Sequence, residues 1–353
     1  MSIIARPDNA ALALEGKLLK GKWNVLRRID PPPGSTGGFF SIGYVVHDGE
    51  REAFLKALNF HAFFALFPGK RVVEILAERT KAFEYERTLL LRVKDHRLSK
   101  VSQLLDEGEE IVMGFTIPQV PYLIFEIAEG DIRSTIRFAG EIDLAWKLKS
   151  LHDVAVGLQQ LYGIKVGHND LKPSNVLLYE SGFVSKLGDL GRSLCSDIVA
   201  PHEDGSFPGD FTYAPPEFLY RFSIPDLSIR MKATDVYLFG SLLVFYFTGT
   251  TMNALLFKNM NEHFRWDRWS GGFDPIKGYL IDGFYKALQE FQSHFSDIKF
   301  GEKLVEMVRY CCWPIPEQRG HPKGLQQLGE QYGFHRMISQ LDLLSKKAEI
   351  RFR

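Results

Sequence analysis

The sequence predicts an α+β protein, with a small, mostly antiparallel sheet followed by a larger, mainly helical part. Two segments near the start of the chain, Trp23–Ile29 and Gly43–His47, have the pattern of strands on either side of a Gly-rich turn. A chain of 353 residues is long enough for two lobes that each bury a core. Further along, apolar residues recur at helical spacing in Leu144, Leu148, Leu151, Ala155 and Leu158.

The elements of the small part follow in order along the chain. Residues 1–22 are a flank for which no structure is predicted. The run from Arg71 to Val93 has the apolar spacing of a helix. The predicted strands are Trp23–Ile29, Gly43–His47, a segment around Lys56, and segments near Ile111 and Tyr122.

Composition argues against several classes of protein. The chain has 43 basic and 43 acidic residues, so no electrostatic footprint for nucleic acid or an anionic membrane stands out. Its three cysteines, Cys195, Cys311 and Cys312, lack the spacing of a disulfide framework or a metal site. We therefore expect a reduced, cytoplasmic protein with neither a nucleic-acid nor a membrane partner.

One apolar run is long enough to raise the question of a membrane span. Residues 236–257 contain no charged side chain and could nominally cross a bilayer. Polar and helix-weakening residues at Thr248–Asn253 interrupt this run, so we interpret it as a buried core helix. Residues 1–19 lack the basic start and long apolar run of a secretory signal.

Two Asp residues and an Asn carry the strongest functional signal. Phosphoryl transfer leaves a protein little covalent work, so catalysis comes from holding metal ions, a nucleotide and a hydroxyl group in line. Asp170 would accept the proton of that hydroxyl, and Lys172 would reach the transferred phosphate. Asn175 and Asp189 would supply oxygen ligands to Mg²⁺. The chain reads His168-Asn169-Asp170-Leu171-Lys172-Pro173-Ser174-Asn175 and then Gly188-Asp189-Leu190-Gly191.

These two segments resemble the catalytic loop and the metal-binding loop of the eukaryotic-type (Hanks-type) Ser/Thr protein kinases. In that family they read His-Arg-Asp-Leu-Lys-x-x-Asn and Asp-Phe-Gly. The resemblance implies a bilobal protein-kinase-like fold, ATP and Mg²⁺ as cofactors, and a protein substrate. It also implies a small lobe at residues 23–127 and a large lobe with a C-terminal helical tail at residues 128–353.

Segments further downstream resemble the family in the expected order. Pro215-Pro216-Glu217 resembles the end of an activation segment, and Arg319 matches the Arg that pairs with the Glu of that segment. Asp235 matches the Asp at the start of the central helix, whose side chain hydrogen-bonds the backbone of the catalytic loop. A buried pair of Glu217 and Arg319 would anchor the activation segment.

Upstream, Ala53-Phe54-Leu55-Lys56 resembles the Val-Ala-Ile-Lys strand of the family. The Lys of that strand contacts the nucleotide phosphates and pairs with a helix Glu. Counting back from Val93 favours Glu86 as the partner of Lys56, with Glu84 as the alternative. The interval between Lys56 and Glu86 is longer than usual in the family, which implies an extra helical piece or loop at residues 60–70.

The glycine-rich stretch departs most from the family pattern. Gly37 and Gly38 would let backbone N–H groups approach phosphate oxygens, and a plain hairpin turn is the alternative interpretation. Phe40 stands where the family has its third Gly.

Residues 122–131 resemble the last strand of the small lobe and the hinge. The resemblance places Phe125 behind the adenine. It also places the Glu126 carbonyl and the Ala128 N–H group at the adenine edge, and Asp131 near the ribose.

Two further departures concern regulation and the acceptor. Asn169 replaces the Arg that, in many family members, pairs with a phosphorylated activation loop. We therefore predict that activity does not depend on phosphorylation within residues 190–210. Asp210 stands where Ser/Thr kinases have the Thr that links the catalytic Asp and Lys, with Thr212 as a possible substitute.

Three functions from different classes are compatible with these motifs. The first is a protein kinase acting on Ser or Thr, which Lys172-Pro173 favours by resemblance. The second is a small-molecule phosphotransferase of the aminoglycoside or choline kinase type, whose architecture lacks the anchor formed by Glu217 and Arg319. The third is a catalytically silent scaffold. All five expected groups argue against that last reading: Lys56, Glu86, Asp170, Asn175 and Asp189.

Overall fold

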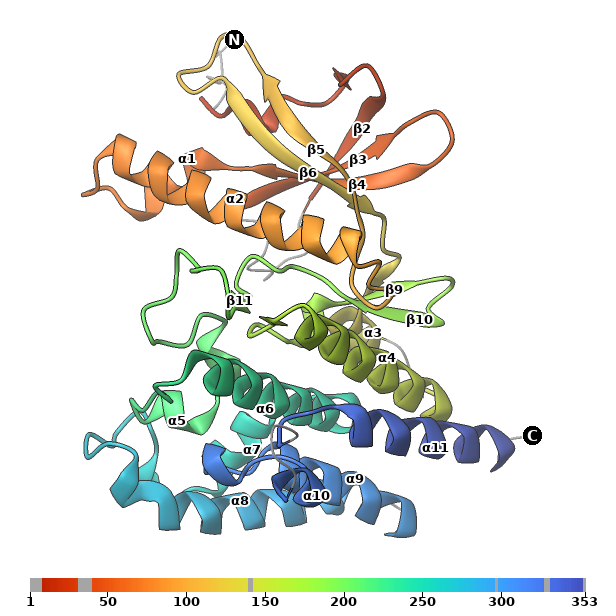
Figure 1. Ribbon diagram of the computed structural model, residues 1–353, viewed down its shortest axis with the longest axis vertical. Helices are drawn as coiled ribbons and strands as arrows, with labels where there is room; N and C mark the ends of the chain where they lie inside the picture. Colours follow the sequence, from red (N-terminus) through yellow and green to blue (C-terminus); the bar gives the residue numbers. More distant parts are fainter. Residues whose placement is uncertain (1–7, 31–39, 139–141, 296–297, 327–330, 352–353) are drawn as a thin grey trace, which may run out of the picture. The chain divides into compact units, whose positions relative to one another are not determined.

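The computed structural model describes residues 8–30, 40–138, 142–295, 298–326 and 331–351 (Figure 1). The chain forms two compact units. Residues 1–97 and 102–128 make up the first, here called the small lobe, and residues 98–101 and 129–353 make up the second, the large lobe. The first contains an antiparallel sheet and the second is mainly helical, which confirms the predicted α+β fold with two lobes.

The small lobe is built on a six-stranded antiparallel sheet with the order β1-β2-β3-β4-β6-β5. Residues alternate between the two faces of each strand. In β4, Ala53, Leu55 and Ala57 are fully buried on one face, whereas Lys56 points to the other. The strands are β1 (Leu18–Leu19), β2 (Trp23–Ile29), β3 (Ser41–His47), β4 (Glu52–Leu58), β5 (Leu104–Ile111) and β6 (Gln119–Glu126).

The N-terminal flank takes part in the core of this lobe. The 3₁₀ turn η1 (Ala10–Leu12) packs with Leu14 and Leu19 against Trp23, within the cluster on one face of the sheet. The hydroxyl of Tyr44 donates to the carbonyl of Ala11 at 2.6 Å. The flank therefore covers apolar sheet surface that would otherwise face water.

Two helices belong to the other side of the small lobe. The sequence predicted an extra helical piece or a loop at residues 60–70, and the helix α1 (Phe60–Leu66) shows that the segment is helical. The long helix α2 (Val72–Asp95) confirms the helical pattern predicted from Arg71 to Val93, and it lies along the sheet (Figure 1). Its buried residues include Glu86 as well as Ile75, Leu90 and Val93.

The large lobe is organised around the helix α6. The side chain of Asp226 caps its first turn by accepting from the Ile229 N–H group, and Gly249 ends it with a φ of +70°. Every residue from Thr234 to Tyr246 is buried. The helices are α3 (Ile132–Phe138), α4 (Leu144–Gly163), α5 (Pro216–Leu219), α6 (Leu227–Thr248), α7 (Met252–Asn259), α8 (Lys277–Gln292), α9 (Ile298–Cys311), α10 (Pro322–Leu325) and α11 (His335–Arg351).

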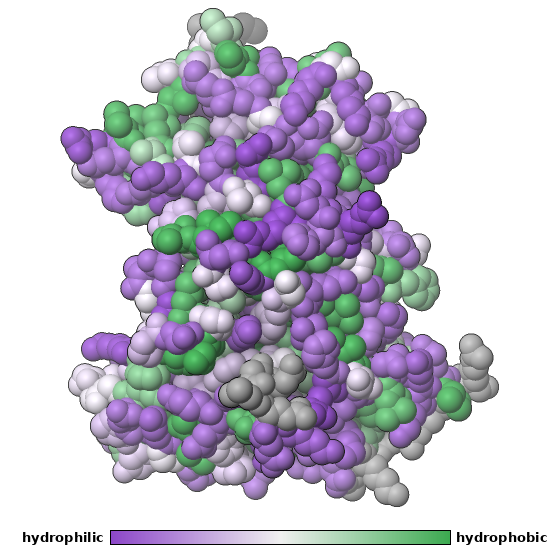
Figure 2. Space-filling view, in the orientation of Figure 1, coloured by the Kyte–Doolittle hydropathy of each residue, from purple (hydrophilic) through white to green (hydrophobic). Residues whose placement is uncertain are grey.

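The large lobe also contains short strands that flank its loops. They are β7 (Gly130–Asp131), β8 (Val166–Gly167), β9 (Val176–Tyr179), β10 (Val184–Leu187) and β11 (Leu194–Cys195). The strands β9 and β10 form an antiparallel hairpin. Within the described residues no single helix has the length and apolar character to cross a bilayer. The helices α6 and α7 have the required length and apolar character only when taken together, and the chain bends by 86° between them. The face drawn in Figure 2 is mostly hydrophilic, with apolar residues scattered among polar ones.

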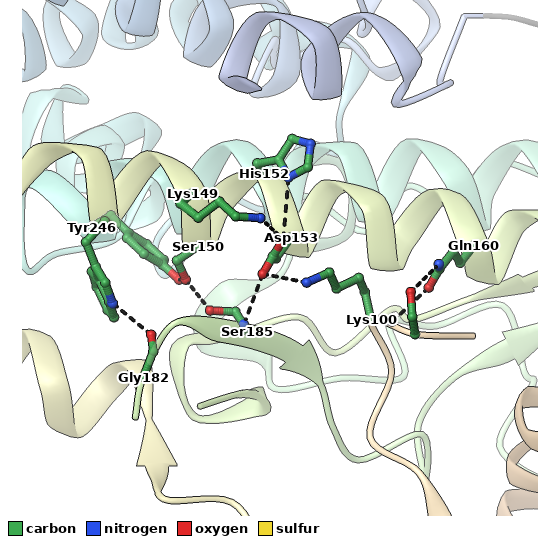
Figure 3. A network of polar contacts seen from close by, with 11 residues as sticks. Lys100, Lys149, Ser150, His152, Asp153, Gln160, Gly182, Ser185 and Tyr246 are labelled. Atoms are coloured by element: carbon green, nitrogen blue, oxygen red, sulfur yellow. Dashed lines mark hydrogen bonds and ion pairs between the residues drawn. The ribbon is translucent and has the colours of Figure 1, made fainter. Parts of the chain in front are cut away.

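A polar network ties residues 98–101 to α4 within the large lobe (Figure 3). Asp153 has no exposed surface, and the ammonium groups of Lys100 and Lys149 lie 2.8 and 2.9 Å from its carboxylate. Burial by itself would raise the pKa of Asp153, but hydrogen bonds from His152, Lys100 and Lys149 hold it well below its usual range. The backbone N–H of Ser185 on β10 also donates to Asp153, at 3.2 Å. This carboxylate therefore links three segments that are distant in sequence.

Candidate functional site

Three donors converge on the carboxylate of Asp170, in the catalytic loop predicted at residues 168–175. Asp170 is 5% exposed, and its oxygens lie 3.0 Å from Lys172 Nζ and 3.1 Å from Asn175 Nδ2. The backbone N–H of Asp210 donates to the same group at 2.9 Å. Both carboxylate oxygens are thus fixed in direction, with a cation beside them. This is the arrangement that a positioned proton acceptor needs.

The central helix holds this loop in place. Asp235 on α6 accepts hydrogen bonds from the backbone N–H groups of His168 at 2.8 Å and Asn169 at 2.7 Å, as the sequence predicted. The amide of Asn169 adds a third donor at 3.0 Å, and this residue has a φ of +53°. Burial raises the pKa of Asp235 to about 7, although these donors oppose the shift. The loop backbone is therefore fixed to a buried group rather than to solvent.

His168 connects the catalytic loop to the segment that carries Asp189. The His168 side chain is fully buried, and its Nε2 lies 3.0 Å from the carbonyl oxygen of Gly188. The backbone N–H of Asp170 donates to His168 Nδ1 at 3.3 Å. Burial lowers the pKa of His168 below its usual value. The neutral ring with its proton on Nε2 satisfies both contacts.

We expect this histidine to make the fold acid-sensitive. The unfolded chain takes up a proton near pH 6.5, whereas the folded chain does so only at lower pH, so stability is lost as the pH falls below about 6.5. His168→Phe removes the titrating imidazole, so the stability of the variant lacks this dependence on pH. Urea unfolding between pH 7.5 and 5 should show the stability gap between wild type and variant narrowing by up to about 1.4 kcal/mol per pH unit. Parallel curves for the two proteins would contradict the assignment.

The β9–β10 hairpin explains how Asn175 and Asp189 come together. Val176 pairs with Leu187 at the end of the hairpin, and the N–H of Gly188 then donates to the carbonyl of Asn175 at 2.9 Å. Asn175 precedes β9 and Asp189 follows β10, so the two residues lie at the same end. An added Cβ at Gly188 would lie 2.6 Å from the end of the Leu177 side chain, so a larger residue there would require that side chain to shift.

These two residues fit a magnesium ion. The Nδ2 group of Asn175 donates to the Asp170 carbonyl at 2.8 Å, which fixes the side chain through its nitrogen and turns its oxygen away from that contact. Asp189 is exposed and has a φ of +59°. One amide oxygen and one carboxylate form the kind of sparse oxygen donor set that Mg²⁺ completes with phosphate oxygens and water.

In the small lobe, Lys56 pairs with Glu86 at 2.8 Å between Nζ and Oε1. The Glu86 side chain is 9% exposed and that of Lys56 is 24% exposed. Glu84, the alternative partner, lies instead 3.3 Å from Arg87 and is 55% exposed. The helix α2 thus turns Glu86 toward β4 and Glu84 toward solvent.

The remaining predicted nucleotide contacts are distributed over both lobes. Glu126 is the last residue of β6, and its side chain accepts from the Gln103 N–H group at 2.9 Å. Ala128 follows it at the end of the small lobe. Asp131 lies on β7 of the large lobe and caps α3 by accepting from the Ser134 N–H group at 2.9 Å. Gly37 and Gly38 lie outside the described residues.

The activation segment is anchored by a buried ion pair. Arg319 has no exposed surface and contacts both carboxylate oxygens of Glu217, at 2.8 and 2.7 Å, which confirms the predicted pair. The same guanidinium donates to the carbonyls of Trp313 and Ala233, each at 3.0 Å. The residue Glu217, which ends the segment, is therefore fixed to the lobe core through one bidentate contact.

Sequence reasoning missed two contacts of this segment. The backbone N–H of Asp210, rather than a Thr hydroxyl, reaches Asp170, and Gly209 gives the close approach because an added Cβ would lie 2.6 Å from the Asn169 carbonyl oxygen. Glu203 forms an ion pair with Arg230 on α6, and the two side chains are 19% and 7% exposed. Gly209 is the one local sequence signal for the contact between Asp210 and Asp170. The sequence pattern carries no signal for the pair of Glu203 and Arg230.

Comparison with known proteins agrees with this geometry. Calmodulin-binding receptor-like cytoplasmic kinase 1 of Arabidopsis thaliana is 28% identical over 254 residues, which are 69% of this chain and 49% of that protein. A probable LRR receptor-like serine/threonine-protein kinase of the same plant is 28% identical over 288 residues, 79% of this chain and 28% of that protein. 3-Phosphoinositide-dependent protein kinase B of Dictyostelium discoideum is 30% identical over 146 residues, 40% of this chain and 15% of that protein.

The chain spans about half the length of the first of these relatives and less of the other two. A family model described as the protein kinase domain matches residues 71–323, which is well over half of the chain. With the catalytic loop, the Lys56–Glu86 pair and the Glu217–Arg319 anchor all present, the chain belongs to the protein kinase family.

Proposed function

We propose that this protein transfers the γ-phosphate of ATP to Ser and Thr hydroxyls of protein substrates. The observation that carries the proposal is the environment of Asp170, whose carboxylate is fixed by Lys172, Asn175 and the Asp210 N–H group. A carboxylate held in one direction beside a cation suits a hydroxyl that must lose its proton as it attacks a phosphate.

Each residue of the site has a proposed role. Asp170 accepts the proton of the substrate hydroxyl, and Lys172 neutralises charge on the transferred phosphate. Asn175 and Asp189 hold Mg²⁺, which supplies positive charge to the phosphate oxygens when bound. Lys56 contacts the nucleotide phosphates and is oriented by Glu86.

Other residues are proposed to bind the nucleotide. Gly37 and Gly38 cover the phosphates through their backbone N–H groups. The Glu126 carbonyl and the Ala128 N–H group contact the adenine edge. Asp131 contacts the ribose, and it would have to share its carboxylate with Ser134, from which it already accepts two hydrogen bonds.

The choice of Ser and Thr rests on the catalytic loop and on the relatives. Lys172-Pro173 resembles the loop of Ser/Thr kinases, and one relative is named a probable LRR receptor-like serine/threonine-protein kinase. A second is named a cytoplasmic kinase, which supports the cytoplasmic location that we propose.

A transfer assay tests the function directly. The protein is incubated with labelled ATP, Mg²⁺ and a generic protein acceptor, and the labelled amino acids are identified after hydrolysis. We expect label on Ser or Thr, lost in Lys56→Ala and kept in Lys17→Ala, because Lys17 pairs with Glu110 away from the Lys56–Glu86 pair. Label on added aminoglycoside or choline alone would indicate a small-molecule phosphotransferase. ATP binding without any transfer would indicate a silent scaffold.

We also predict that turnover does not require phosphorylation of residues 190–210. In this chain Glu203 supplies the negative charge that pairs with Arg230, and Asn169 replaces the Arg that would read a phosphate. Phosphatase treatment should leave kcat unchanged. Glu203→Gln should lower kcat, because the pair with Arg230 loses its charge. A large loss of rate after dephosphorylation would refute this prediction.

A further inference from the structure

The helix α1 is held by contacts that join three separate segments of the small lobe. With seven residues it is too short to be stable alone. The side chain of Asn59 caps it, since its oxygen accepts from the Ala62 N–H group at 3.3 Å and from Asn9 Nδ2 at 2.9 Å. The backbone N–H of Asn59 donates to the Phe40 carbonyl at 3.2 Å. The start of α1 is thereby tied to the N-terminal flank and to the residue that precedes β3.

Phe63 lies at the centre of these contacts. Its side chain is 3% exposed and stacks on Phe40 with ring centroids 5.0 Å apart and 17° between the planes. The guanidinium carbon of Arg79 lies 4.4 Å from the centre of the Phe63 ring. The Nε atom of Arg79 is buried without a hydrogen-bond partner among the described residues, while Nη2 lies 3.5 Å from Glu78 and the side chain is 23% exposed. The Phe63 ring therefore covers the buried part of this guanidinium.

Arg79 and Glu86 lie on the same stripe of α2. They are seven residues apart, which is close to two helical turns, and the buried residues Ile75 and Val93 continue the stripe in both directions. A helix is rigid over this distance. A contact that fixes Arg79 against α1 therefore also sets the rotation of α2 that points Glu86 at Lys56.

Phe40 connects the contacts around Phe63 to the sheet. It immediately precedes β3, where Gly43 pairs with Lys56 of β4. Its side chain is 41% exposed, so burial alone does not account for an aromatic ring at a position where a glycine is expected. The ring instead covers Phe63. The stack thus links the strand beside Lys56 to α1, and the contact of Arg79 with Phe63 continues this link to α2, the helix that carries Glu86.

We propose that Phe63, packed against Phe40 and Arg79, is a positioning residue that keeps Glu86 on Lys56. The proposal rests on the proposed function, because the Lys56–Glu86 pair matters to the reaction only if Lys56 holds nucleotide phosphates. Removing the ring frees α2 to rotate, so Lys56 loses its orienting partner for part of the time. The effect passes through Glu86 and not through the overall stability of the lobe.

A double-mutant cycle tests this route. Phe63→Leu keeps an apolar side chain but removes the ring. We expect it to raise the Kd of a fluorescent ATP analogue, and to lower kcat/KM, about fivefold. In a Glu86→Gln background the same change should have an effect of less than about twofold, because the interaction that it supports is already lost. Phe40→Tyr should behave like wild type, and Phe40→Leu should behave like Phe63→Leu.

Phe115→Leu serves as the matched control. Phe115 is a partly buried aromatic residue of the same lobe, packed against the cluster that holds the N-terminal flank. It should lower the unfolding midpoint without changing nucleotide affinity. Equal losses of affinity from Phe63→Leu in the wild-type and Glu86→Gln backgrounds would overturn the proposal. So would equal effects of Phe63→Leu and Phe115→Leu on affinity.

The two proposals can fail separately. Nucleotide binding is measured without a protein acceptor. A protein that binds ATP but transfers no phosphate would contradict the proposed function, and the binding test of Phe63 could still be carried out. Hydrogen exchange at the amides of residues 79–86 gives a readout without any nucleotide. We expect these amides to exchange faster in Phe63→Leu than in wild type, and at the wild-type rate in Phe115→Leu. Wild-type exchange rates in both variants would contradict the proposal.

Discussion

Asp170→Asn is expected to lower kcat for phosphoryl transfer to protein by about 10³-fold. The amide has nearly the shape of the carboxylate, and its oxygen can still accept from the Asp210 N–H group. It cannot take up a proton, however, and it no longer offers negative charge to Lys172, whose ammonium lies 3.0 Å away. The loss should therefore appear in kcat, with little change in the Kd for ATP.

Asp197→Asn is a suitable control for this variant. Asp197 is also an acidic residue of the large lobe, but its carboxylate is 38% exposed and lies 3.6 Å from Lys165. Its replacement should leave kcat unchanged. A transfer rate of Asp170→Asn within about tenfold of wild type, measured with labelled ATP, would remove Asp170 as the proton acceptor.

Arg319→Met is expected to lower the free energy of unfolding by about 3 to 5 kcal/mol. The variant is destabilised because Glu217, the partner of Arg319, remains buried without a counter-charge. Glu217 has 1% of its side chain exposed and would be left as an uncompensated charge, and the carbonyls of Trp313 and Ala233 would lose their donor. The same change should reduce activity, because Glu217 closes the activation segment.

The double variant separates charge from packing. Glu217→Leu together with Arg319→Met removes both charges, and apolar replacements of a buried pair are often close to neutral. It should therefore be more stable than Arg319→Met alone in urea unfolding. Lys346→Met is the matched control, since Lys346 lies 2.7 Å from Asp342 on the exposed side of α11 and should matter little. A double variant as unstable as the sum of its two single changes would contradict this account.

Local chemistry made much of the site predictable. The residues from His168 to Asn175 lie close together in sequence, so their spacing alone places an acid, a cation and an amide in one loop. The resemblance to the protein kinases implied that Lys56 pairs with a helix Glu, and counting along the helix then favoured Glu86 over Glu84, because an α-helix repeats its faces regularly. An extra piece of chain at residues 60–70, helical or a loop, was predicted from the unusually long interval between Lys56 and Glu86, whereas its contacts were not predicted.

Contacts made by the backbone were not predictable in this way. The N–H of Asp210 reaches Asp170 whatever side chain residue 210 carries, so the residue type at position 210 does not signal this contact. The ion pair between Glu203 and Arg230 joins a loop to a helix through two residues that belong to no motif. The place of residues 98–101 in the large lobe likewise depends on Lys100 meeting the buried Asp153.

The sequence by itself, through motifs of fixed spacing that resemble the protein kinases, determined the two-lobed α+β fold and the partners Asp235, Glu217 and Arg319. It also predicted the catalytic and metal-binding roles of the two loops, which stay proposals. Only the tertiary structure decided that Phe63 packs against Phe40 and Arg79, and that Ala10, Leu14 and Leu19 complete the core of the small lobe. Apolar and aromatic contacts are non-directional and tolerate many partners. Which of them form is therefore settled by how the whole lobe packs.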